Sequence, residues 1–462
     1  MLSTIESINN VVNDFIWGVP AMICIIGVGL YLSIRMGFIQ VRKFAYAMKV
    51  TIGRIFRKRE ASDGALTPFQ AVCTALAATV GTGNIAGVAG AIAIGGPGAV
   101  FWMWVTALIG SSTAFIEATL AQLYKEKDPL YGGYRGGPAY YMHRYMERRQ
   151  KKKKRYSLIA VLFAISGLIC WCGISQVISN SVTSSLENAF SVPPLYTTIV
   201  LVALAAVIVL RKNATVKVLD LLVPVMAVCY FVLTIVIIFR NIGSLPQVFE
   251  RIFQEAFGFR QIAAGGFGAV LMNGIKRGLF SNEAGSGSAP CAAAAAECEN
   301  PVQAGLVQAL GVFIDTIVIC SCTAMIMLLV PEDLVAGLSG MELLQTAMRY
   351  HLGEFGVIFI AATLFMFSFS TFLGILFYAR SNVAYLFGDN WLSQTAYKVM
   401  ALVMLFAGGL AAYTVVWDLG DVGIGLMTIF NTAILYLLGG EALKELREYE
   451  AGKACKKKSL EE

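Results

Sequence analysis

A short run of small and polar residues interrupts a long apolar stretch in the first third of the chain. The stretch covers residues 70–94, and Gly81-Thr82-Gly83-Asn84 lies near its middle. A glycine inside a helix costs about 1 kcal/mol relative to alanine, so the run predicts a broken helix. Such a break leaves N–H groups free on one half and C=O groups on the other. These groups suit a carboxylate and a small cation, respectively.

The composition indicates where this break lies. Of the 462 residues, 57% are hydrophobic and only 14% are charged, whereas soluble proteins carry about 25% charged residues. We therefore predict an integral membrane protein. Non-helical backbone at membrane depth is tolerated only where protein buries it or water reaches it. Residues 1–15 contain no Lys or Arg, so we expect no cleavable signal peptide and a first apolar segment that is retained.

The net charge of +7 does not indicate a nucleic-acid partner, because the basic residues form short runs between apolar segments. Cytoplasmic loops of membrane proteins have this pattern. We interpret the run Lys151–Arg155 as a topology anchor that contacts anionic lipid headgroups. Most of the ten cysteines lie inside apolar segments, and His143 and His351 are the only histidines. We therefore expect core cysteines and no Cys/His metal site.

At about 20 apolar residues per membrane span, the sequence predicts eleven transmembrane helices. They lie near 14–34, 68–94, 98–121, 157–178, 194–210, 218–239, 258–279, 302–330, 356–378, 395–415 and 422–439.

The loops predict the orientation of these helices. The segments 35–59 and 125–155 are rich in Lys and Arg, whereas 179–193 and 414–421 contain neither. The positive-inside rule then places the N-terminus outside and the C-terminus inside. This arrangement requires an odd number of spans, and eleven satisfies it.

The seventh predicted span resembles the second in being interrupted. Its residues 263–287 contain several glycines and the pair Asn273-Gly274. Since the two broken spans lie five apart, spans 2–6 and 7–11 run in opposite directions. Inverted halves that each begin with a broken helix are typical of secondary transporters. The predicted divisions are an extra N-terminal helix and basic loop (1–66), a first repeat (67–240), a second repeat (241–440) and a cytoplasmic tail (441–462).

Two other interpretations of the first break were weighed. Residues 81–86 fit the dinucleotide pattern G-x-G-x-x-A, but that motif requires a preceding strand and an acidic residue about twenty positions on. Phe101–Trp104 occupies that place, so the dinucleotide interpretation is rejected. Small residues also allow membrane helices to pack closely, and Gly87 and Gly90 fit that role. An Asn in the middle of a span, however, requires a polar partner.

Polar residues in other spans admit alternatives. Ser370 and Thr371 could supply oxygen ligands to a cation, or each could bond a carbonyl of its own helix. Lys276 and Arg277 could line a pocket or extend to the membrane surface. Asp315, deep in an apolar span, could be a structural partner of another helix or a coupling group.

Four stretches together resemble one known family, the sodium:alanine (alanine or glycine:cation) symporters of the amino acid–polyamine–organocation superfamily. They are 79–87, 95–110, 274–285 and 311–316, and the match extends from about residue 10 to 440. The resemblance implies a leucine-transporter-like fold of five plus five inverted helices with one extra N-terminal helix. It also implies Na⁺ coupling and a small amino acid as substrate.

One departure from the family pattern concerns the substrate. The family continues the Ser-Thr pair with Gly-Trp-Ser-Tyr-Tyr-Gly-Glu, whereas this chain has Ile375 in place of Trp and Arg380 in place of Glu. A smaller side chain at 375 should enlarge the pocket. Glutamine, serine or methionine is therefore a possible substrate beside alanine and glycine.

We thus expect a symporter of the cytoplasmic membrane that imports a small neutral amino acid with Na⁺ by alternating access. The run 81–84 should receive the substrate carboxylate, with Asn273 and Gly274 near its amino group or side chain. Backbone around Thr79, together with the Ser370–Thr371 pair, should bind Na⁺.

Other classes fit less well. We expect no enzymatic activity, no organic cofactor and no nucleic-acid partner. We expect membrane lipids to surround the protein. The sequence does not predict an oligomeric state. A channel would need a continuous polar stripe along several spans. A proton-coupled carrier with Asp315 as the titrating group is the closer alternative.

Overall fold

The structure, a computed structural model, describes residues 11–55, 79–210, 215–258 and 267–461. Within this part the chain is almost entirely helical. Its only strands are β1 (Glu126–Lys127) and β2 (Tyr134–Arg135), which form a short antiparallel hairpin. The prediction of an all-α protein is confirmed.

Six helices of the described part are long and apolar enough to cross a membrane. They are Val11–Arg35, α8 (Gly98–Leu123), α10 (Leu158–Phe190), the helix Pro301–Leu328, α21 (Glu354–Phe387) and α23 (Tyr413–Glu461). A seventh is added if α12 (Thr215–Arg240) and α13 (Leu245–Ala256) count as one span, bent by 77°. The chain is a multi-pass membrane protein, as its composition predicts.

A helix lies at each of the eleven predicted ranges, but four of these helices are not among those long and apolar enough to cross a membrane. They are the helix Gly83–Gly95, α11 (Pro194–Val209), α15 (Phe267–Asn282) and α22 (Trp391–Leu410). Parts of the second and seventh predicted spans, 68–78 and 259–266, lie outside the described residues. Eleven spans in five-plus-five repeats therefore stay a prediction.

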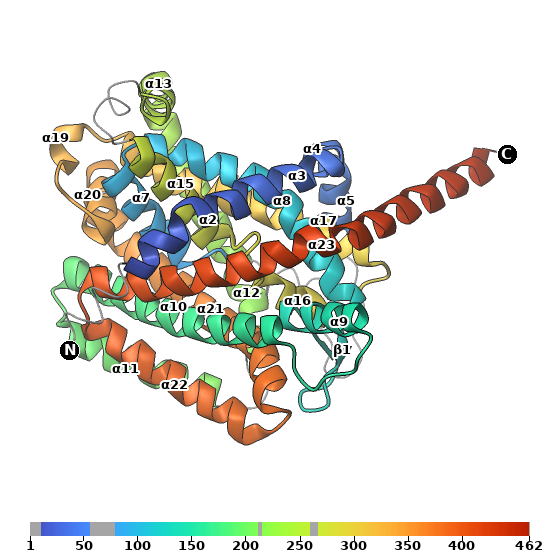
Figure 1. The fold of residues 1–462 in the computed structure, drawn as a ribbon. Helices are drawn as coiled ribbons and strands as arrows, with labels where there is room; N and C mark the ends of the chain where they lie inside the picture. Colours follow the sequence, from blue (N-terminus) through green and yellow to red (C-terminus); the bar gives the residue numbers. More distant parts are fainter. Residues whose placement is uncertain (1–10, 56–78, 211–214, 259–266, 462) are drawn as a thin grey trace.

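The long helices run side by side (Figure 1). α10 packs against α21, α22 and α23, and α8 packs against α15 and α17 (Pro301–Val312). α19 (Glu332–Val335) and α20 (Gly340–Leu352) lie at one end of the bundle. The opposite end carries α4 (Ile39–Arg42), α5 (Phe44–Ile55), the β-hairpin and α9 (Pro138–Gln150). The described parts of the two basic segments, 35–55 and 125–155, thus share one end.

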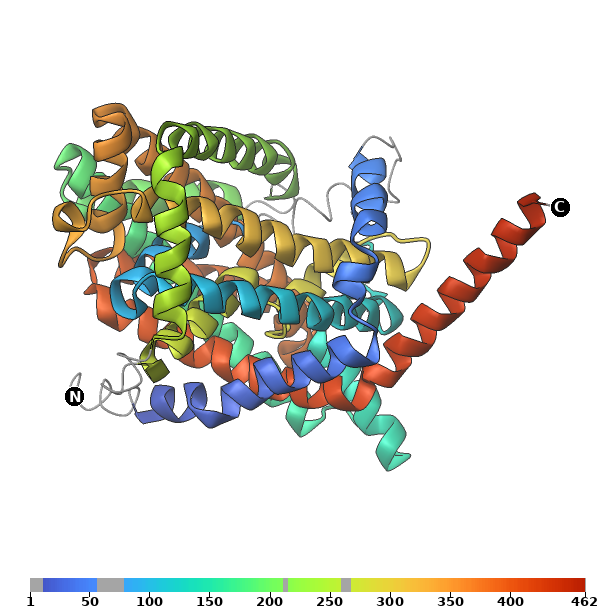
Figure 2. The ribbon, with the colours of Figure 1, turned by 90° about the horizontal axis from the view of Figure 1, so that it is seen from above.

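α23 is much longer than a membrane span. Its 49 residues extend about 73 Å at 1.5 Å per residue, against a hydrocarbon core of about 30 Å. The last part of the helix leaves the bundle at the basic end, in red in Figures 1 and 2.

Two helices are interrupted inside the bundle. The first interruption lies at Val80–Gly81, before η2 (Gly83–Gly87) and α7 (Val88–Gly95). The second lies at 283–288, between α15 and α16 (Ala289–Ala295). In it, three residues have positive φ: Glu283 at 55°, Gly285 at 93° and Gly287 at 88°. Gly285 and Gly287 adopt such angles at no steric cost, so the chain turns here and becomes helical again only at α16.

Candidate functional site

The side chain of Asn84 holds the first break in shape. The Gly81 N–H donates to Asn84 Oδ1 at 2.7 Å, and the backbone N–H of Asn84 donates to the Gly81 carbonyl at 3.2 Å. Asn84 is fully buried. A side-chain oxygen that accepts from a free N–H at a helix start acts as a cap. The sequence therefore encodes both the break and the group that satisfies it.

The other end of the Asn84 amide contacts a distant helix. Asn84 Nδ2 donates to Asp315 Oδ1 at 2.8 Å and to the Asp315 carbonyl at 3.1 Å. Asp315 lies on η4 (Phe313–Cys320), a wide π-type turn within the helix Pro301–Leu328. Turns of this kind occur frequently at functional sites. The polar partner that a mid-membrane Asn requires is thus a buried carboxyl group.

Asp315 also contacts the second broken helix. Its Oδ2 accepts from Ser281 Oγ at 2.8 Å and from Thr316 Oγ1 at 2.9 Å. An ideal Cβ on Gly83 would lie 3.1 Å from Ser281 Cα and 3.4 Å from Phe280 Cδ1. The two broken helices therefore pack directly on each other here, and one carboxyl group bonds to both.

α21 closes a third side of the break. An ideal Cβ on Gly81 would lie 1.7 Å from Thr371 Oγ1, and Thr82 Oγ1 lies 2.9 Å from Ser368 Oγ. Thr79 is buried just before the break. The structure therefore brings the predicted carboxylate-binding backbone and Thr371 of the predicted cation pair into contact.

The hydroxyl groups of the Ser-Thr pair already bond to their own helix. Ser370 Oγ and Thr371 Oγ1 donate to the Phe367 carbonyl at 2.8 and 3.0 Å. These two bonds match the alternative considered above, in which each hydroxyl bonds a carbonyl of its own helix. They do not exclude ion binding, because a hydroxyl that donates keeps two lone pairs for a cation. Ile375 is fully buried one helical turn further on, on the same face of α21 as Thr371.

The predicted roles of Asn273 and Gly274 stay a prediction; in the structure both residues lie within the helix α15. Asn273 Nδ2 donates to the Ala269 carbonyl of its own helix at 2.9 Å. An ideal Cβ on Gly274 would lie 2.5 Å from Trp102 Cβ, so this glycine allows α15 to pack closely on α8. Phe280 and Ser281, nearly two turns later in α15, are the residues that pack on Gly83 of the first break.

Comparison with known proteins identifies the family. Residues 2–462 match the model of the sodium:alanine symporter family. The chain belongs to this family. Its members are transporters, not enzymes, and the resemblance inferred from the motifs is confirmed.

Several relatives within the sodium:alanine symporter family cover nearly the whole chain. The "Probable sodium/glutamine symporter GlnT" of Bacillus subtilis is 40% identical, covering 99% of this chain and 93% of its own. The sodium/alanine symporter AgcS of Methanococcus maripaludis is 37% identical, covering 97% and 99%. A mutant form of the manganese transporter of Eremococcus coleocola superposes with a TM-score of 0.52 at 11% identity, over 84% of this chain and 81% of its own. This last likeness concerns the fold alone.

In this family member, the two cations of α15 do not extend to a surface. Arg277 forms a two-point ion pair with Asp421 of α23, with nitrogen–oxygen distances of 3.0 and 3.1 Å. Lys276 Nζ lies 2.6 Å from the same carboxylate. Arg277 also stacks on Trp417, 4.3 Å from the ring centre. This cluster attaches the second broken helix to α23.

Another buried acid shapes the second break in this family member. Glu117 of α8 accepts from the Gly285 N–H at 2.9 Å and from the Asn431 side chain of α23. These hydrogen bonds hold residues 283–287 in the left-handed turn that follows the end of α15.

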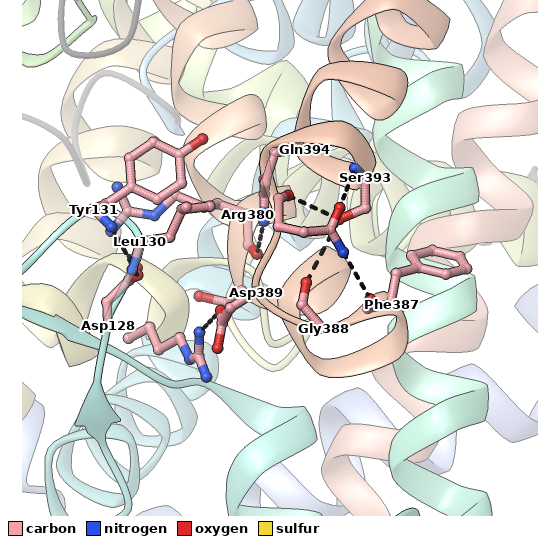
Figure 3. A network of polar contacts seen from close by, with 12 residues as sticks. Asp128, Leu130, Tyr131, Arg380, Phe387, Gly388, Asp389, Ser393 and Gln394 are labelled. Carbon is pink, nitrogen blue, oxygen red and sulfur yellow. Dashed lines mark hydrogen bonds and ion pairs between the residues drawn. The ribbon is translucent and has the colours of Figure 1, made fainter.

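Arg380, the charge that departs from the family pattern, belongs to a network at the basic end of the bundle (Figure 3). Its Nη2 lies 3.2 Å from Asp128 Oδ2, and its guanidinium covers the Tyr131 ring at 4.2 Å. Asp128 Oδ1 also accepts from the N–H groups of Leu130 and Tyr131 at 3.1 and 3.0 Å. Arg380, at the position where the family pattern has Glu, thus attaches the β-hairpin to α21.

Sequence reasoning did not find the partners of the break. Asp315 was singled out, but without a link to Asn84, and Ser281 and Ser368 were not considered as site residues. The sequence offered one signal for these partners: Asp315 is a lone carboxylate deep in an apolar span, and such a group requires buried hydrogen-bond donors. Which donors they are depends on contacts between residues more than thirty positions apart.

Proposed function

We propose that this protein is a Na⁺-coupled symporter that imports a small neutral amino acid across the cytoplasmic membrane by alternating access. The substrate is alanine, glycine or a larger neutral amino acid such as glutamine. Family membership supports Na⁺ as the coupling ion. The relatives named for alanine and for glutamine support the range of substrates.

The observation that carries the proposal is the meeting of three helices at the Gly81–Asn84 break. The backbone N–H groups of residues 81–84, a row of hydroxyls on α21 and a buried carboxyl group gather there. The substrate carboxylate binds the N–H groups of residues 81–84, and its amino group lies toward Phe280 and Ser281. Na⁺ binds the hydroxyls of Ser370 and Thr371 and carbonyl oxygens near Thr79.

Coupling follows from this shared location. Gly81 belongs to the substrate segment and contacts Thr371, a proposed cation ligand. Each ligand fixes the break in the shape that the other requires, so each raises the affinity for the other by the same factor.

The proposal includes the arrangement in the membrane. The two broken helices begin inverted repeats of five spans each, and Val11–Arg35 is the extra helix. The end that carries α5, α9 and the β-hairpin faces the cytoplasm, because its loops are rich in Lys and Arg.

The test is uptake of a labelled amino-acid panel into proteoliposomes, with and without an inward Na⁺ gradient. For the Thr371→Ala variant we expect loss of Na⁺-dependent uptake with the protein still inserted. Thr234→Ala is the matched control, because Thr234 also bonds the carbonyl four residues earlier in a buried helix. Unchanged Na⁺ dependence in Thr371→Ala would remove that residue from the site.

The buried carboxyl of Asp315 makes a proton-coupled carrier the second candidate. Uptake that proceeds without Na⁺ and follows a pH gradient would favour it. Uptake driven by Na⁺ at constant pH would exclude it.

A further inference from the structure

Two basic residues in the turn between α4 and α5 share one carboxylate. Arg42 Nη1 and Lys43 Nζ lie 3.2 and 3.0 Å from the same oxygen, Oε1 of Glu450 on α23. The Arg42 side chain is 47% exposed and the Lys43 side chain 33% exposed. Ion pairs this open to solvent contribute little to stability, and two cations here face one anion. The turn can therefore accept a further anion or exchange Glu450 for one.

An apolar cavity lies beside these ion pairs, between α5, α17 and α23. Its volume is about 180 Å³, and an apolar cavity of about 150 Å³ is large enough to bind benzene. Besides Lys43 and Glu450, the cavity is lined by apolar and aromatic side chains, namely Tyr46, Val302, Leu306, Leu446 and Tyr449. The hydroxyls of the two tyrosines bond to each other at 2.6 Å, so their polar ends are paired. The cavity therefore suits a hydrocarbon segment.

A narrower cleft continues from this cavity along α17. It shares Lys43 and Leu306 with the cavity and reaches Leu310 and Phe313. From Leu306 to Phe313 the helix rises about 10 Å at 1.5 Å per residue. This helix, Pro301–Leu328, packs against α5 at the basic end of the bundle and is long and apolar enough to cross a membrane (Figure 1). The cleft thus runs from the two cations into the membrane-spanning part of the protein.

The surroundings of the two cations are those of a membrane interface. Val41 of α4 and Phe38 just before it are 67% and 47% exposed. Apolar side chains exposed beside basic ones are typical of a segment that lies in the headgroup region. Basic pockets between transmembrane helices on the cytoplasmic side bind anionic lipid headgroups. A ligand that matches both parts of the site carries an anionic group joined to a hydrocarbon chain.

We infer that Arg42 and Lys43 bind the phosphate of an anionic phospholipid, and that one of its acyl chains fills the cavity and the cleft between α5, α17 and α23. The site goes beyond the proposed symport, because it contacts neither the substrate nor the coupling ion. A phosphate on these two cations repels Glu450, which occupies the same place. Lipid binding therefore loosens α23 from the turn between α4 and α5.

Native mass spectrometry of the purified full-length protein tests the site with two probes of equal chain length, a phosphatidylglycerol and a phosphatidylcholine. We expect the wild-type protein to retain phosphatidylglycerol in preference to phosphatidylcholine. Arg42→Gln with Lys43→Gln should weaken this binding about tenfold or more, the scale expected for two basic residues at an anionic surface.

The matched control is Lys152→Gln with Lys153→Gln. It removes the same charge from the exposed basic run 151–155, which attracts anionic lipids without a cavity beside it. Equal retention of the two lipids by the wild-type protein would overturn the site. Equal losses of phosphatidylglycerol in the two double variants would also overturn it, because attraction by any basic segment would then explain the binding.

Leu306→Phe tests the cavity with both cations in place. The larger ring should narrow the cavity and weaken phosphatidylglycerol binding several-fold. Leu435→Phe is its control, at a fully buried leucine of α23 that does not line the cavity. Equal binding by these two variants would overturn the acyl-chain site. Displacement of the lipid by an equal concentration of inorganic phosphate would overturn it as well, since the headgroup alone would then decide binding.

Glu450→Gln tests the competition at the two cations. We expect it to raise the affinity for phosphatidylglycerol several-fold, because the competing carboxylate is gone and an exposed ion pair adds little to folding. An ion pair with a purely structural role would give no such gain. An affinity that stays unchanged or falls in Glu450→Gln would overturn the assignment of the phosphate to Arg42 and Lys43.

Discussion

Gly81 and Thr371 approach so closely that position 81 has room only for a hydrogen atom: an ideal Cβ there would lie 1.7 Å from Thr371 Oγ1 and 3.0 Å from Thr371 Cβ. The contact joins the broken segment to α21, and both residues belong to helices that the proposed mechanism requires to fit together.

Gly81→Ala should therefore abolish uptake and destabilise the protein, because overpacking of this kind costs about 1–3 kcal/mol or more. Thermal unfolding in detergent measures the second effect. In a Thr371→Ala background the added cost of Gly81→Ala should shrink, since Oγ1 is gone. Gly311→Ala is the control, because an ideal Cβ at Gly311 meets nothing within 4 Å. Equal losses at positions 81 and 311 would contradict the explanation.

Ile375→Trp should shift substrate preference toward glycine and alanine. The side chain is fully buried one turn beyond Thr371, so a larger ring there must take volume from its surroundings. Competition of a panel of neutral amino acids against one labelled substrate measures the shift. An unchanged order of preference would separate Ile375 from the pocket. Ile424→Trp, at another fully buried isoleucine, controls for general overpacking.

Asp421→Asn should destabilise the protein strongly, because it leaves Arg277 and Lys276 largely buried without their anion. Removing one partner of a buried ion pair costs about 3–5 kcal/mol. Glu448→Gln is the control, since Glu448 and Lys444 form an exposed pair on the same helix. Such pairs contribute about 1 kcal/mol at most. Similar unfolding temperatures for the two variants would show that the cluster does not attach α15 to α23.

Arg380→Gln should release the β-hairpin from α21 while Asp128 keeps its bonds to the N–H groups of Leu130 and Tyr131. We expect faster limited proteolysis within 126–135 and a loss of about 2 kcal/mol, typical of a hydrogen bond to a charged group. Arg349→Gln, which breaks the exposed pair with Glu354, should leave the cleavage rate unchanged. A hairpin that stays resistant would assign its position to its other contacts, the ion pair of Arg135 with Asp389 and the ring contact of Tyr131 with Trp391.

The sequence predicts the helices well, because apolar residues at membrane length leave few alternatives. It also predicts the first break, where Gly81 and Gly83 follow each other closely. For the second break it gives only the wide range 263–287, because glycines occur throughout that range. Gly274 serves close packing on α8, whereas Gly285 and Gly287 supply positive φ. Composition does not distinguish these two uses of glycine.

The partners of the break were beyond sequence reasoning for a different reason. Asn84 and Asp315 are separated by 231 positions, and no local periodicity connects them. A lone Asn and a lone Asp in separate spans each predict a polar partner. Only the packed fold shows that they satisfy each other, and that one carboxyl also bonds the second broken helix.

Because α23 is so long, it connects two distant parts of the protein. Near one end it binds Arg277 of the second broken helix through Asp421, and about 44 Å further along, at 1.5 Å per residue, Glu450 pairs with Arg42 and Lys43. A straight rod of this length converts a tilt of about ten degrees into a displacement of about 8 Å. A small rearrangement at the second broken helix thus becomes a movement at the basic end that a spectroscopic label can follow.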